Sequence, residues 1–231
     1  MAYAELTQQN PLRVLRMNTE SHMGLIISRA GLGKTAILAQ IALDAILRGK
    51  RVLHVSIGRG IDKIKARYDE ILQMILEEHT VEHPHELIDM VNRHRLIMTF
   101  QVANFSRSRL EERLHDLIVQ DIFRPNVLIV DGFDFAKADR AALEDLKNLG
   151  ENLGLQAWFS AIRHREDERV SPRGVPAPCH EVDDLFDTVI VIVPNPAESC
   201  LDLQILCLNG EKTAGAKGLH LDPTTMMIKE R

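Results

Sequence analysis

The stretch of sequence that decides the fold is Ser28-Arg29-Ala30-Gly31-Leu32-Gly33-Lys34-Thr35. Residues 24–28 form a short apolar run typical of a buried strand, and residues 34–48 repeat apolar side chains at helical spacing. A strand, a glycine-rich turn and a helix in this order gather backbone N–H groups at a helix N-terminus, where anions bind. The stretch therefore predicts a phosphate-binding loop of the Walker A type.

The residues of this loop have expected roles toward a nucleotide. Gly33 lets the backbone approach phosphate oxygens, Lys34 reaches the β- and γ-phosphates, and the Thr35 hydroxyl binds Mg²⁺. The loop departs from the usual motif at its first position, where Ser28 replaces glycine and a Cβ makes a positive φ costly. The residues expected to bind ATP or ADP are Arg29, Ala30, Gly31, Leu32, Gly33, Lys34, Thr35 and Ala36.

An apolar run that ends in an acid complements the loop. Residues 127–130 are all apolar and are followed by Asp131. Parallel α/β sheets bind ligands at the carboxyl ends of their strands, so Asp131 is expected to orient a Mg²⁺-bound water beside Thr35. We predict Lys34 and Asp131 as catalytic residues, and Thr35 and Asp131 as the groups that hold the metal. Asp134 is more typical of a turn residue.

Outward from these two segments, strand and helix patterns alternate. Expected strands cover 51–57, 96–100, 127–131 and 155–160, and expected helices cover 34–48, 61–76, 84–92, 110–122 and 138–153. Nearly continuous apolar strands alternating with helices predict a parallel sheet covered on both faces. After an exposed polar loop at 163–180, strands at 188–193, 201–206, 218–221 and 226–228 follow without helices, which predicts an antiparallel extension of the sheet.

Length and composition favour one domain over residues 1–231. The chain is 45% hydrophobic and 26% charged, which is ordinary for a globular protein. Residues 1–22 are expected to form a polar lead-in, in which Leu12, Val14 and Leu15 pack as an edge strand or clip.

Charge and cysteine content exclude several classes. A formal charge of −5 and an aromatic content of 4% disfavour general affinity for nucleic acid and for anionic membranes. No apolar run approaches the ~20 residues of a membrane span, and the N-terminus lacks a signal-peptide pattern. The three cysteines, Cys179, Cys200 and Cys207, are an odd and sparse set that favours reduced thiols and a cytoplasmic protein.

Together, the 28–35 loop, the strand ending at Asp131, the strand containing Ser160 and the helix-poor C-terminal strands resemble the RecA-like P-loop ATPases, especially the group with the KaiC clock ATPase and the DnaB-type helicases. This resemblance implies a three-layer α/β/α P-loop NTPase fold, with a central, mostly parallel sheet and antiparallel C-terminal strands. It also implies a site for ATP and Mg²⁺, and association with copies of itself or with a protein partner.

Three departures from the family concern catalysis. Where the family has a catalytic glutamate after the second strand, this chain has Gly58, and where it has a polar γ-phosphate sensor, this chain has Ser160. Of the basic pair that reaches a neighbouring subunit's nucleotide, only Lys212 is present. A missing general base costs ~10²–10⁴ in rate and a missing arginine finger ~10³–10⁵. The resemblance thus implies slow or partner-dependent hydrolysis, unless Asp62 or Asp134 takes the role of the base.

The sequence leaves three functional hypotheses. The first is a nucleotide-dependent switch or assembly factor. The second is a P-loop kinase or other ATP-using transferase that acts on a small substrate, since such enzymes share a strand like Gly49-Lys50-Arg51-Val52 and the 163–180 loop could close over an acceptor. The third is a DNA-associated recombinase or helicase-type ATPase, which the acidic composition disfavours.

Overall fold

The structure is a computed structural model in which residues 3–16, 22–164, 166–213 and 218–231 are described. The strands are β1 (His22–Ser28), β2 (Val52–Ile57), β3 (Arg95–Phe100), β4 (Val127–Asp131), β5 (Gln156–Ile162), β6 (Thr188–Asn195), β7 (Cys200–Leu208), β8 (Glu211–Lys212), β9 (Leu219–Leu221) and β10 (Ile228–Glu230). The α-helices are α1 (Tyr3–Gln9), α2 (Lys34–Leu47), α3 (Ile61–Glu78), α4 (Pro84–His94), α5 (Arg107–Val119) and α6 (Arg140–Leu153). Three 3₁₀ helices are η1 (Pro11–Leu15), η2 (Val102–Asn104) and η3 (Asp183–Leu185).

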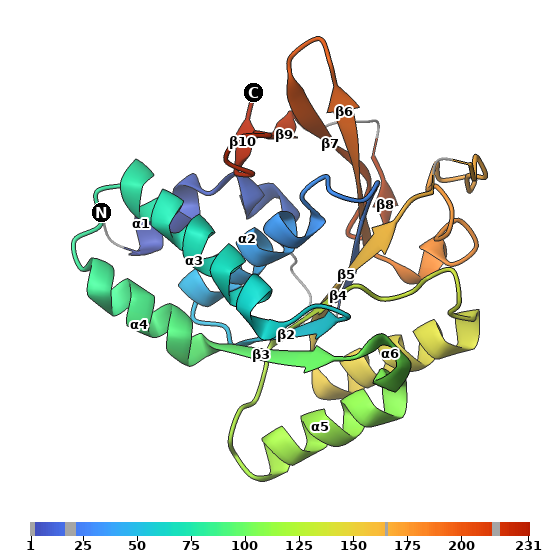
Figure 1. Cartoon of the computed structure of the whole chain (residues 1–231), viewed down its shortest axis with the longest axis horizontal. Coiled ribbons are helices and arrows are strands. Elements are labelled where there is room, and N and C mark those ends of the chain that lie inside the picture. The colour runs from blue at the N-terminus through green and yellow to red at the C-terminus, as the bar shows by residue number, and fades with distance from the viewer. Residues whose placement is uncertain (1–2, 17–21, 165, 214–217) are drawn as a thin grey trace.

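Helices cover both faces of a single sheet (Figure 1). Side chains alternate across each strand, so Ile26 of β1 packs with α1 to α4 on one face, while Leu25 and Ile27 pack with α5 and α6 on the other. The fold is therefore α/β with a mostly parallel central sheet, and the arrangement is compatible with three α/β/α layers. Among the described residues, every helix is too short or too polar to cross a lipid bilayer.

The strand order is β10-β9-β7-β6-β1-β5-β4-β2-β3, with β8 paired to β7. The strands from β6 to β3 in this row all pair in parallel. The antiparallel part begins at β7 and continues through β8, β9 and β10.

The antiparallel extension was predicted to start one strand too early. Thr188–Asn195 runs parallel to β1, and the antiparallel pairing begins on its other side, with β7. A parallel pair needs a crossover of about a dozen residues or more, and the segment from 163 to 187 is long enough to return the chain to the opposite end of the sheet.

The N-terminal segment differs from the predicted edge strand. Its described residues form α1 and η1, and Leu6, Leu12 and Leu15 are buried against the α2 side of the core. Pro11 begins the helical turn and the Asn10 side chain accepts a hydrogen bond from Leu12 N, both of which favour a helical start over a strand. Residues 1–2 and 17–21 of the expected lead-in lie outside the described residues.

The segment after β5 is less exposed than the sequence predicts. Val175, Ala177 and Cys179 are fully buried, and Asp183 accepts hydrogen bonds from Ser171 Oγ and, through its backbone carbonyl, from Arg173. Val175 and Cys179 pack against the face of the sheet that carries α5 and α6. The described part of this segment is therefore a packed element of the fold.

Candidate functional site

The 28–35 loop joins β1 to α2 through two glycines with left-handed backbone. Gly31 has φ +82° and Gly33 has φ +87°, a region that glycine enters without steric cost. Gly33 caps α2, and its carbonyl accepts a hydrogen bond from Ile37 N at 3.0 Å. A Cβ on Gly33 would lie 2.6 Å from Leu221 Cδ2, so this position requires glycine for space as well as for conformation.

Ser28 supports the loop without strain. It is the last residue of β1, and its φ is not positive, so the cost expected from its Cβ does not arise. Its hydroxyl lies 3.1 Å from Lys34 Nζ and accepts a hydrogen bond from it. Ser28 therefore helps to position the lysine that follows the glycines.

Lys34 is folded back over its own loop. Its Nζ donates to Ser28 O at 3.2 Å and to Arg29 O at 2.9 Å, in addition to the Ser28 hydroxyl. Burial lowers the pKa of Lys34 to about 8; the nearby Asp131 opposes this shift and Arg59 adds to it. All three hydrogen-bond partners are neutral oxygens, which leaves the ammonium charge available to an anion.

Thr35 and Asp131 meet although they lie 96 residues apart in the sequence, because α2 begins at the edge of the sheet where β4 ends. Thr35 Oγ1 donates to Asp131 Oδ2 at 2.7 Å. From β5, which lies between β1 and β4, Ser160 Oγ donates to the other oxygen, Asp131 Oδ1, at 2.6 Å and accepts from Gly132 N at 3.1 Å. Ser160 thus fixes the buried carboxylate in place.

The donor set at this point suits a hard divalent cation. Mg²⁺ takes oxygen ligands, usually one or two carboxylates together with waters and substrate phosphates. The hydroxyl of Thr35 and the carboxylate of Asp131 supply oxygens side by side, so the residues present fit Mg²⁺. A second group of possible ligands, Glu198, Cys200 and Asp202, lies on the β6–β7 hairpin, where Arg231 pairs with both carboxylates.

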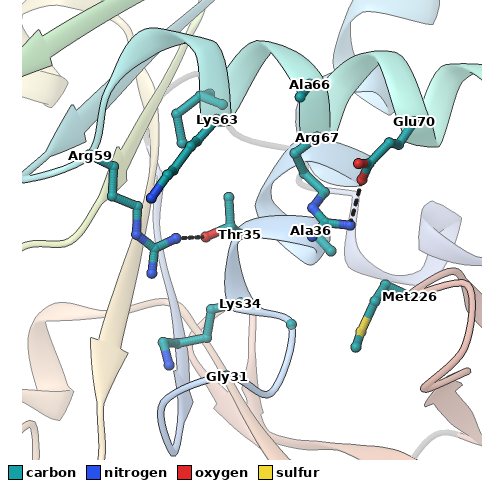
Figure 2. Close-up of a pocket in the computed structure, with 12 residues that line it drawn as sticks. Gly31, Lys34, Thr35, Ala36, Arg59, Lys63, Ala66, Arg67, Glu70 and Met226 are labelled. Atoms are coloured by element: carbon teal, nitrogen blue, oxygen red, sulfur yellow. Dashed lines mark hydrogen bonds and ion pairs between the residues drawn. The ribbon is translucent and has the colours of Figure 1, made fainter.

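A pocket of about 490 Å³ opens beside the loop. Figure 2 shows its two walls, with the loop and the start of α2 on one side and α3 on the other. Met226 closes one end, and Gln40 of α2 holds it there by donating to Met226 O at 2.8 Å. The lining residues are Gly31, Gly33, Lys34, Thr35, Ala36, Arg59, Lys63, Ile64, Ala66, Arg67, Glu70 and Met226.

Five of the residues expected to bind nucleotide line this pocket: Gly31, Gly33, Lys34, Thr35 and Ala36. The other three, Arg29, Ala30 and Leu32, do not line it, although Arg29 O accepts a hydrogen bond from Lys34. Asp131 lies directly behind Thr35 and is buried.

Sequence reasoning missed the wall that α3 provides. Arg59 in the turn before α3 lines the pocket together with Lys63, Arg67 and Glu70 of the helix, and the four residues lie four, four and three positions apart. Arg67 pairs with Glu70 at 2.8 Å, while Arg59 reaches Thr35 and Asp131. The helical spacing of these charges was a usable signal, but only the packing of α3 on the loop reveals which face it serves.

Gly58 ends β2 in a conformation that a side chain would strain. Its φ is +79°, its N–H donates to Phe100 O at 2.8 Å, and a Cβ would lie 2.9 Å from Val102 Cγ2. The other two acids considered as a base do not line the pocket: Asp62 is exposed in the first turn of α3, and Asp134 pairs with Lys137 at 3.0 Å. Lys212 on β8 donates to Pro172 O at 3.3 Å.

The chain matches no model of a known protein family and no curated protein. The function has to be argued from the chemistry of the site itself.

Proposed function

We propose that this protein binds a magnesium–nucleoside triphosphate between the 28–35 loop and α3, and that it acts as a nucleotide-dependent switch or assembly factor related to the RecA-like P-loop proteins. The observation that carries the proposal is the 2.7 Å contact between Thr35 Oγ1 and Asp131 Oδ2 beside the buried Lys34. A metal ion at Thr35 and Asp131 and the ammonium of Lys34 could both contact the oxygens of one polyphosphate.

The charge of the pocket supports a polyphosphate over a monoanion. Lys34, Arg59, Lys63 and Arg67 contribute four basic groups to the lining, and Glu70 is the one acid among the lining residues. The N-terminus of α2 adds backbone N–H groups and its dipole to the same side of the pocket. A ligand with several negative charges matches this surplus of positive charge.

The pocket also has the size and the apolar surface of a small-molecule site. Its volume of about 490 Å³ falls within the usual range for such sites, and Ile64, Ala66 and Met226 supply apolar contacts beyond the charged groups. These contacts would lie along the ribose and base of a nucleotide whose phosphates reach the loop.

The placement of acids supports a switch over an efficient ATPase. Gly58 carries no side chain, Asp62 and Asp134 do not line the pocket, and the carboxylate of Glu70 is paired with Arg67. Groups that hold a nucleotide are therefore in place, whereas a free carboxylate aimed at an attacking water is missing from the lining of the pocket. On this proposal hydrolysis is weak, or depends on another copy of the chain or on a protein partner.

Calorimetry with MgADP and MgATP tests the nucleotide site. Lys34→Ala removes the phosphate-binding ammonium and is expected to abolish detectable binding. Lys50→Ala is the matched control, because Lys50 Nζ likewise donates to a neutral oxygen, Gln156 Oε1 at 3.1 Å, but at the opposite end of the sheet. Unchanged nucleotide affinity in the Lys34 variant would refute this site.

A second cavity favours one alternative function, phosphoryl transfer to a small acceptor. It measures about 1060 Å³, lies at the carboxyl ends of β2 and β3, and shares Arg59 with the first pocket. Arg109 and Arg113 line it and would suit an anionic acceptor. A kinase would consume ATP only when an acceptor is supplied, whereas a switch would change its oligomeric state or partner binding with nucleotide alone.

A further inference from the structure

The guanidinium of Arg59 contacts the two oxygens that suit the divalent cation, Thr35 Oγ1 and Asp131 Oδ2. Its Nη1 donates to Thr35 Oγ1 at 2.6 Å and lies 3.5 Å from Asp131 Oδ2. Figure 2 shows the guanidinium directed from the turn between β2 and α3 toward the Thr35 hydroxyl. One arginine therefore already places a positive charge beside the carboxylate that a metal would need.

The backbone that carries Arg59 is held by its neighbours. Gly58 turns the chain at the end of β2, and the Arg59 carbonyl accepts a hydrogen bond from Ser56 Oγ at 3.4 Å. The side chain is freer, since half of its surface is exposed. It borders both the pocket beside the loop and the larger cavity at the ends of β2 and β3, so it has room to move from one to the other.

A metal and this arginine compete for the same groups. The Thr35 hydroxyl gives its single proton to Asp131 and accepts from Arg59, and Mg²⁺ would have to approach the same oxygen to about 2.1 Å. Two cations that share one carboxylate also repel each other.

We propose that Arg59 and a divalent cation exclude one another at Thr35 and Asp131, so that Arg59 sets the metal concentration at which the site becomes occupied. The coupling to nucleotide rests on the function proposed above, because the nucleotide arrives with its metal. Displacement of Arg59 by the metal would also change the lining of the larger cavity at the ends of β2 and β3. Metal binding would thereby alter a second surface of the protein, as a switch requires.

The neighbouring bases of α3 provide the control. Lys63 lines the same pocket. Within the described part of the chain, the groups that bond Thr35 Oγ1 or pair with Asp131 come from other residues than Lys63. Arg67 is paired with Glu70. Lys63→Ala thus removes one positive charge from the pocket without removing the contact to the metal-binding oxygens.

Binding of Mn²⁺ alone, followed by electron paramagnetic resonance, is the direct test. Arg59→Ala is expected to raise the Mn²⁺ affinity about two- to fivefold, the range expected when a half-exposed charge pair is removed. Arg59→Lys keeps the charge and is expected to change the affinity less, and Lys63→Ala should leave it close to that of the native chain. Equal or weaker Mn²⁺ binding by Arg59→Ala, or the same gain in Lys63→Ala, would overturn the proposal.

Nucleotide binding gives an independent measurement. The ratio of the affinity for MgADP to the affinity for ADP in EDTA should rise in Arg59→Ala, because loss of the arginine strengthens metal binding in the ADP complex and leaves the affinity of Mg²⁺ for free ADP unchanged. Equal weakening of both affinities would mean that Arg59 binds phosphate instead, and would overturn the proposal. If the native chain binds Mn²⁺ but no nucleotide, the proposed function fails, while the Mn²⁺ titration alone still decides the role of Arg59.

Discussion

At the scale of single residues, Lys34 carries the charge on which the proposed phosphate binding would depend, in surroundings that weaken this charge. Burial lowers its pKa to about 8, and within the described part of the chain its ammonium donates to the oxygens of Ser28 and Arg29. An anion that replaces these neutral partners strengthens every hydrogen bond of the lysine. Binding and protonation of Lys34 are therefore linked.

This linkage predicts how nucleotide affinity depends on pH. The pKa of Lys34 in the free protein is lowered to about 8, so the ammonium is lost as the pH rises through that value. A bound phosphate raises the pKa again, which means that binding takes up a proton above pH 8. We expect the affinity for MgADP to fall about tenfold between pH 7 and pH 9, as measured by calorimetry in buffers of different ionisation heat.

Lys34→Arg is the control for this pH dependence, because a guanidinium keeps its charge throughout the range. If the variant still binds, its affinity should be the same at pH 7 and pH 9. A native chain with equal affinity at both values would show that Lys34 is fully protonated at pH 9 and would contradict the expectation.

At the scale of elements, β1 is held between β5 and β6, and this position leaves little room around it. Gly24 is paired in register with Trp158 of β5, and a Cβ on Gly24 would lie 2.3 to 2.6 Å from atoms of the indole ring. The strand that leads into the 28–35 loop therefore depends on a residue without a side chain. Trp158 is itself buried and has little freedom to move away.

Gly24→Ala is accordingly expected to lower the free energy of unfolding by about 1–3 kcal/mol, the usual cost of an overpacked core. Gly150→Ala in α6 is the control, since its Cβ would make an ordinary 3.7 Å contact with Leu155 O. This helical substitution should be neutral or stabilising by up to about 1 kcal/mol. Urea denaturation measures both, and equal stability of the Gly24 variant and the native chain would contradict this packing of β1.

The long periodic elements could be predicted from the sequence because their apolar spacing is a local property. The strand at 127–131 was predicted at its observed bounds, and α2 was predicted one residue too long. The direction of β6 was not predictable from its side chains, because a run such as Val189 to Val193 is apolar in either orientation. The short α1 and the two-residue β8 offer too few residues for a periodic pattern.

The candidate site, too, was only partly predictable from the sequence. Lys34, Thr35 and Asp131 were singled out because each belongs to a local motif, and the structure brings them together. The contributions of α3 and of the turn before it depend on how they pack on the loop, so Arg59 and Lys63 could be placed at the pocket only from the structure. Ser160 was noted in the sequence for the position of a phosphate sensor, whereas in the structure its hydroxyl binds Asp131.

At the scale of the whole molecule, α2 is held near its middle and near its C-terminal end by distant parts of the chain. Near its C-terminal end the buried Asp44 accepts hydrogen bonds from Asn10, Arg16 and Arg48, which ties the N-terminal segment to the helix. In its first half Gln40 bonds Met226 and Ile228 of the C-terminal segment. The helix that presents Lys34 and Thr35 is therefore fixed at several points, which suits a site that holds its ligand.

The same rigid arrangement leads to the expectation that the isolated chain hydrolyses ATP slowly. Gly58 cannot polarise water, and a Gly58→Glu variant is not expected to restore a base, because its φ of +79° and the 2.9 Å approach to Val102 oppose any side chain there. A missing base costs about 10²–10⁴ in rate, so single-turnover hydrolysis by a monomeric preparation should fall well below about 1 s⁻¹. Lys34→Ala sets the background. A rate that rises with protein concentration would support a charge supplied by a neighbouring copy, which is one of the two cases that the proposed function allows. Turnover near 1 s⁻¹ by the monomer would instead mean that Glu70 leaves Arg67 to act as the base, and would favour an enzyme over a switch.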